Sequence, residues 1–158
     1  MVMDLSDVFL SLGAETFAEL LKTVSMGKLR TYQMVDSVKA RARVAKLNSE
    51  SLRKAGPRLW SRLEAREEDV AEDLAQAILV CQLDLIIAVL DFLGLPHEGG
   101  FFAKDVDASR YLTEGWQQRV WEEFRDRFPH PALLFYINHL AWELAKSEPL
   151  FTPEKPGQ

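Results

Sequence analysis

The sequence predicts an all-α fold: a compact single-domain helical bundle of five to seven helices around a long central helix over residues 67–93. Two observations carry this prediction. Apolar residues recur at helical spacing along the chain, and no appreciable stretch alternates apolar and polar residues as a half-buried strand does. Glycine and proline stand between the periodic segments, where helices usually end. Of 158 residues, 47% are hydrophobic and 27% charged, which is typical of one globular domain, and we expect it to cover residues 1–148.

The first part of the chain predicts several short helices. Asp4 or Ser6 can cap a first helix that runs to about residue 25, with Gly13 inside it as a candidate bend. A second helix covers residues 31–47. A third begins near residue 49 and stops at Gly56-Pro57. Pro57 then opens another short helical piece, PRLWSRL, because proline is well tolerated in the first turn of a helix.

The second part predicts the central helix and two more. The central helix has an acidic first turn, which the positive end of a helix dipole favours, and it ends at Gly94. The remaining segments are a loop at 97–109, a helix at 113–128, a last helix from Pro131 to about residue 146, and a proline-containing tail at 149–158 that we expect to be disordered.

The last helix carries large aromatic residues on two sides. Its leucines form a core face, while Phe135, His139 and Trp142 lie on the opposite side at about 100° per residue. Either this helix is sandwiched between other elements of the chain, for example under the first helix, or the second face meets a partner. A two-fold homodimer is one way to cover such a strip. We therefore predict a protein interface at Phe135, His139 and Trp142.

Positive charge is concentrated in one region of an acidic chain. Twelve of the 19 Lys and Arg residues, but three of the 24 Asp and Glu residues, lie between Lys22 and Arg66. One interpretation is that residues 37–63 bind the phosphates of a nucleic acid. The favoured one is an internal match, because the seven-residue spacing of Lys39 and Lys46 equals that of Asp84 and Asp91. The candidate phosphate contacts of the first interpretation are Lys39, Arg43, Lys46, Arg53, Lys54 and Arg58.

No catalytic or metal-binding motif stands out in the sequence. His139 and Glu143 have helical i,i+4 spacing, but a carboxylate-bridged metal site in a bundle needs several such groups. Cys81, the one cysteine, is expected to be a buried thiol, and a single cysteine fits a reducing compartment. The most apolar stretch, residues 74–95, contains Asp84 and Asp91, so a membrane span is not expected.

The sequence thus favours a cytoplasmic, non-enzymatic protein–protein interaction or regulatory module that binds another protein or itself and needs no cofactor. A nucleic-acid-associated protein is the alternative, and a small-molecule or metal-dependent enzyme is third.

Overall fold

The computed structural model describes residues 4–23, 49–98, 101–102, 110–144 and 151. The predicted all-α class is confirmed, and seven helices lie within these ranges. Two dipeptides, β1 (His97–Glu98) and β2 (Phe101–Phe102), pair antiparallel inside the segment predicted as a loop. The helices are α1 (Leu5–Leu10), α2 (Ala14–Leu21), α5 (Ser49–Glu64), α6 (Glu68–Cys81), α7 (Leu83–Leu93), α8 (Trp116–Phe124) and α9 (His130–Leu144).

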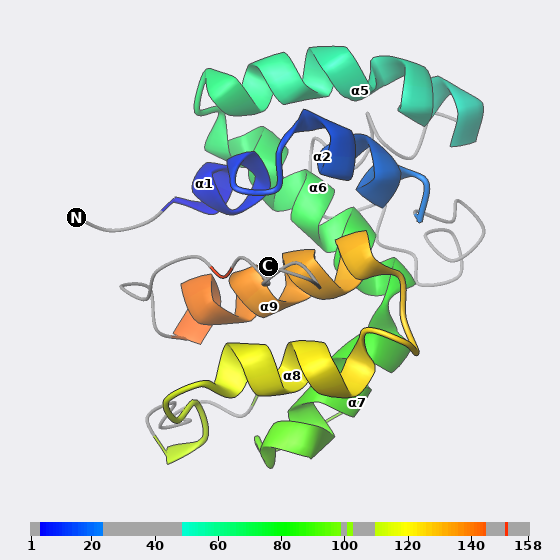
Figure 1. The fold of residues 1–158 in the computed structure, drawn as a ribbon. Coiled ribbons are helices and arrows are strands. Elements are labelled where there is room, and N and C mark those ends of the chain that lie inside the picture. Colours follow the sequence, from blue (N-terminus) through cyan, green and yellow to red (C-terminus); the bar gives the residue numbers. More distant parts are fainter. Residues whose placement is uncertain (1–3, 24–48, 99–100, 103–109, 145–150, 152–158) are drawn as a thin grey trace, which may run out of the picture.

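The last helix, α9, occupies the middle of the molecule (Figure 1). It contacts α1 and α2 on one side and α8 on another. Beyond these neighbours, α5 packs on α1 and α2, and α7 packs on α8. Other helices cover α9 on nearly all sides, which explains why it is apolar on nearly all sides. Its buried apolar residues are 132, 133, 135–137 and 140–141.

The predicted central helix over 67–93 is in fact two helices. α6 and α7 meet at Gln82 and are inclined to each other by 85°. The backbone of Gln82 leaves the helical region, with φ −121° and ψ 30°, although the sequence there contains neither proline nor glycine. The break lets α6 pack on α1 and α5 while α7 turns away to pack on α8. The predicted end at Gly94 is confirmed, since Gly94 adopts the left-handed conformation with φ 78°.

Two glycines act differently from the prediction. Gly13 does not bend one helix but separates α1 from α2, with φ 82° and ψ 157°, a region that glycine adopts at low cost. Gly56-Pro57 does not end a helix, because α5 continues through it to Glu64. Gly56 is buried, and a Cβ placed there would lie 3.3 Å from Leu21 Cδ1. Because glycine has no side chain, α5 can approach α2 closely at this position.

The predicted helix at 31–47 lies outside the described residues. Of the predicted tail at 149–158, the structure describes Phe151, which is partly buried against the core. Leu85, Val89 and Cys81 are buried as expected. Within the described residues, no single helix is both long and apolar enough to cross a membrane.

Candidate functional site

Most of the face of α9 predicted to meet a partner lies inside the molecule. Phe135 has no exposed surface and stacks on Phe9 of α1, with ring centroids 4.9 Å apart and planes inclined by 28°. His139 is 6% exposed, and Trp142 is partly buried against the core. This corrects the expectation of an exposed aromatic strip. The chain's own first two helices cover that face of α9, which is the sandwiched arrangement left open by the sequence.

His139 is a neutral side chain packed among aromatic rings. Its imidazole contacts the rings of Phe135, Tyr136 and Trp142. Its Nδ1 is buried and makes no hydrogen bond, and it lies 3.6 Å from Glu143 Oε2. Burial lowers the pKa of His139 to about 4, because an imidazolium is poorly solvated there.

The two groups beside His139 are shifted by the same burial. Desolvation raises the pKa of the Glu143 carboxyl, and desolvation followed by the charge of Glu143 raises the pKa of the Tyr136 phenol. Burial therefore disfavours the charged form of each of these groups. A neutral imidazole surrounded by aromatic rings supports packing more than proton transfer at neutral pH.

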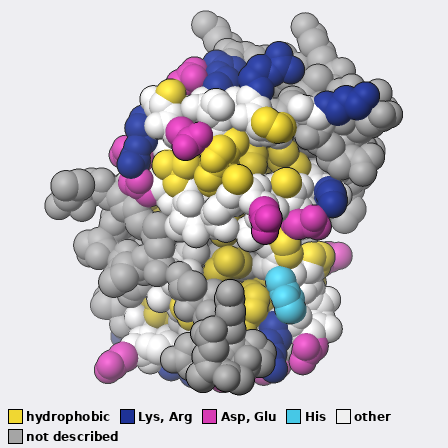
Figure 2. Space-filling view, turned by 45° about the horizontal axis from the view of Figure 1, so that its top comes forward, with side chains coloured by type: hydrophobic (Ala, Val, Ile, Leu, Met, Phe, Trp, Pro, Cys, Tyr) yellow, Lys and Arg dark blue, Asp and Glu magenta, His cyan; other side chains and the backbone are white. Residues whose placement is uncertain are grey.

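The basic segment is described in part. Lys39, Arg43 and Lys46 lie outside the described residues, as does the side chain of Arg53. Lys54 and Arg58 are exposed on α5, one helical turn apart. Figure 2 shows Lys and Arg side chains gathered along its upper edge, at the end of the molecule where α5 lies. The predicted pairing of Lys39 and Lys46 with the α7 carboxylates stays a prediction, and in the structure Asp91 Oδ1 lies 2.7 Å from His97 Nε2.

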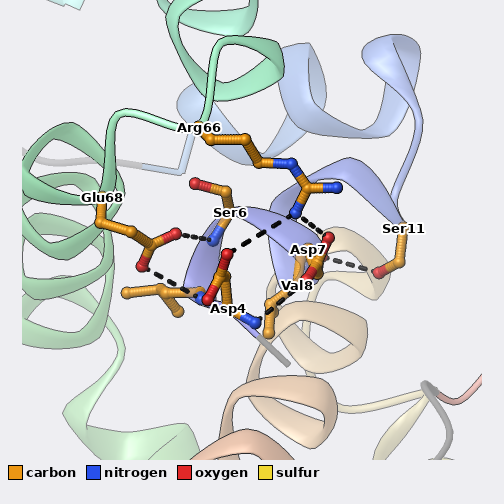
Figure 3. Close-up of polar contacts among 8 residues, drawn as sticks. Asp4, Ser6, Asp7, Val8, Ser11, Arg66 and Glu68 are labelled. Carbon is orange, nitrogen blue, oxygen red and sulfur yellow. Dashed lines mark hydrogen bonds and ion pairs between the residues drawn. The ribbon is translucent and has the colours of Figure 1, made fainter. Parts of the chain in front are cut away.

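Two other arginines of the basic region pair with carboxylates of the same chain. Arg62 donates to both oxygens of Glu67, and this hydrogen bond is the main cause that raises the pKa of Arg62. Arg66 bonds to Asp7 and lies 3.9 Å from Asp4 at the start of α1 (Figure 3). Part of the positive charge is therefore matched internally.

The start of α1 is held by a carboxylate from another helix. Glu68, the first residue of α6, accepts hydrogen bonds from the backbone N–H groups of Leu5 over 3.2 Å and Ser6 over 2.9 Å (Figure 3). The first N–H groups of a helix have no partner inside the helix, and a negative charge there is favoured by the dipole. This junction joins α1 to the turn between α5 and α6 and has a structural role.

A different arrangement on α9 was not predicted. Asn138 has no exposed surface, although it lies among apolar residues. Its Nδ2 donates to the backbone oxygen of Phe151 over 3.1 Å, and its Oδ1 accepts from the backbone N–H of Phe151 over 2.6 Å. A side-chain amide carries the same donor and acceptor as a peptide unit, so the two bonds resemble those between paired strand residues. We call Asn138 with the backbone groups it holds the backbone clamp.

The ring of Phe151 lies against α8. Its centroid is 6.4 Å from that of Trp121, with planes inclined by 53°, which is within the range of favourable aromatic contacts. Trp121 is nearly buried and also contacts the ring of His130, at 5.1 Å. His130 in turn places Nε2 2.7 Å from the backbone oxygen of Arg125. The indole on which Phe151 packs is therefore held from the start of α9.

Asn138 could have been singled out from the sequence as an amide in a helix that is apolar on several sides. Helical periodicity marks such a residue as unusual, but it does not identify the partner of the amide. Phe151 carried even less information, because the prolines around it predicted a tail rather than a contact.

Within the described part of the chain, no group of three or more His, Cys, Asp or Glu side chains is placed to hold a metal ion. Comparisons of the sequence and structure with protein-family models, curated proteins and solved structures gave no match.

Proposed function

We propose that this chain is a cytoplasmic, non-enzymatic protein-interaction module that holds an extended polypeptide segment on the face formed by α8 and α9. The observation that carries the proposal is the backbone clamp. An amide buried without partners costs about 1–3 kcal/mol, whereas here both polar groups of Asn138 are bonded to one backbone. A leucine at this position would fill similar space without the free-energy cost of burying polar groups. The two hydrogen bonds to the bound segment therefore explain why an amide is found here.

The clamp recognises backbone rather than a side chain. Any residue except proline offers the N–H and C=O pair that Asn138 binds, as in the recognition of extended peptides by a sheet edge. Side-chain preference comes from the neighbouring Trp121, which favours an aromatic or apolar residue at the held position. Together these features define a short extended segment with one aromatic anchor.

The experiment uses the full chain with Phe151→Pro, which removes both the ring and the N–H that occupy the clamp. A fluorescein-labelled peptide of residues 147–155 (SEPLFTPEK) is titrated with this variant and followed by fluorescence polarisation. Because the contact is much smaller than a standard interface, we expect a dissociation constant on the order of 0.1 mM.

The matched control adds Asn138→Leu to the Phe151→Pro chain. This substitution keeps the volume but leaves the peptide backbone without its two bonds, so saturable binding should be lost. Circular dichroism confirms that both variants are folded. A folded Phe151→Pro chain that binds no peptide at 1 mM would refute the proposal.

The nucleic-acid alternative is favoured by one observation, the exposed pair Lys54 and Arg58 on α5. Phosphate contacts release counterions, so affinity for a DNA or RNA duplex should fall steeply between about 50 and 200 mM salt. Lys54→Glu with Arg58→Glu should abolish that binding. If no duplex or single strand binds at 50 mM salt, this alternative is removed.

A further inference from the structure

Resting on the proposed function, we infer that the backbone clamp is autoinhibited: the chain's own Phe151 is its resident occupant and excludes a partner segment of the same chemistry. The contacts of Phe151 support its role as the occupant. Both polar groups of Asn138 are used by Phe151, and the ring of Phe151 lies on Trp121. A second backbone cannot form the same bidentate pair while Phe151 is in place.

The sequence around Phe151 suits a clamp of this kind. Pro149 and Pro153 stand two residues before and after it. In an extended chain, N–H groups two residues apart point to the same side, and proline has no N–H. An extended PLFTP segment therefore offers the clamp one N–H, that of Phe151, with none beside it on that side.

Proline also lowers the entropic cost of ordering a bound peptide, because its φ is already fixed in the polyproline II range. The partner that fits the site is thus an extended segment with an aromatic residue between prolines at the second position on either side. Its backbone would bind Asn138, and its ring would bind Trp121.

The size of the inhibition follows from the tether. Residues 145–150 join α9 to Phe151, and a short tether gives an effective concentration in the millimolar range. Against a separate peptide with a dissociation constant on the order of 0.1 mM, the resident segment leaves the site open about one-tenth of the time. The apparent affinity of the wild-type chain should then be roughly 10-fold weaker than that of the Phe151→Pro chain.

The test compares three full-length chains with the same labelled peptide of residues 147–155. Wild type and Phe151→Leu both keep the backbone N–H and an apolar side chain at the held position, so both should bind weakly. Phe151→Pro should bind roughly 10-fold more tightly. A second peptide, methylated on the backbone nitrogen of its phenylalanine, lacks the N–H that Oδ1 of Asn138 accepts and should bind none of the three chains.

The outcomes separate this inference from the proposed function. Equal, saturable binding to wild type and Phe151→Pro leaves the interaction site standing and overturns autoinhibition. Binding to neither chain overturns both. Equal binding of the methylated and unmethylated peptides overturns the role of Asn138 as the clamp.

One further measurement shows whether the Phe151 bound by Asn138 belongs to the same chain or to a second copy. If the clamp were filled by Phe151 of a second copy, light scattering would show a wild-type dimer that Phe151→Pro converts to a monomer. That result would overturn the assignment of the resident segment to the same chain. We expect the two chains to have the same mass in solution.

Discussion

The stack between Phe9 and Phe135 determines how α9 is covered, and a double-mutant cycle measures it. Both rings have no exposed surface, and their centroids are 4.9 Å apart with planes inclined by 28°. Truncating a fully buried phenylalanine to alanine typically costs about 3–5 kcal/mol, since it removes apolar contact and leaves a cavity. Phe135→Ala should therefore lower the free energy of unfolding by that amount.

The stacking itself is isolated with the gentler changes Phe9→Leu and Phe135→Leu. Aromatic pairs contribute about 0.5–1.5 kcal/mol beyond the area they bury, and this is the coupling energy that we expect from the cycle. Urea titrations followed by far-ultraviolet circular dichroism give the four free energies of unfolding. Equal denaturant slopes in the four chains would show that the comparison is valid.

The matched control is the pair formed by Phe92 and Phe124, whose rings meet at 5.5 Å and 80°. Phe92 is 43% exposed, so its truncation should cost clearly less than that of Phe135. A Phe135→Ala chain with the stability of wild type, or a coupling below about 0.3 kcal/mol, would refute the placement of α1 on α9.

Three further predictions concern single residues. In a Glu143→Gln background, the free energy of unfolding should fall by about 3 kcal/mol between pH 6.5 and pH 4. Burial lowers the pKa of His139 in the folded chain to about 4, so over this range the proton is taken up mainly by the unfolded chain. Adding His139→Leu should remove this dependence on pH. Glu143 is replaced because its raised pKa acts with the opposite sign. Glu68→Ala should lower the free energy of unfolding by about 1–2 kcal/mol and speed amide hydrogen exchange at the start of α1. Glu68→Gln keeps a hydrogen-bond acceptor, so it should lower the free energy of unfolding by less. Gly13→Ala should cost about 1–3 kcal/mol from the backbone alone, measured by urea titration, because no atom lies near the added Cβ.

The fold class followed from the sequence because helical spacing is a local property. The end of α7 at Gly94 followed for the same reason, since a left-handed glycine is encoded at one position. The break at Gln82 could not be predicted in this way. No local rule interrupts the helix there, and the bend is set by the separate partners that α6 and α7 find in the folded chain.

Local rules also failed where packing overrode them, as at Pro57 inside α5. For α9, the sequence showed that two sides were apolar but not which element covered the second. The backbone clamp could be predicted even less well from the sequence. Its partner is a main-chain group of Phe151, and main-chain groups are the same at every position of a sequence.

The central place of α9 has a consequence for how the chain is made. Phe9 is synthesised near the beginning, yet the ring on which it stacks belongs to a helix near the other end of this sequence. At ribosomal speeds of about 5–20 residues per second, Phe135 follows Phe9 by roughly 6–25 s. During that interval, α1 and α2 present their apolar faces without the helix that covers them, and contacts so distant in sequence are also slow to form. The nascent chain therefore exposes apolar surface, which is prone to aggregation, until α9 has emerged.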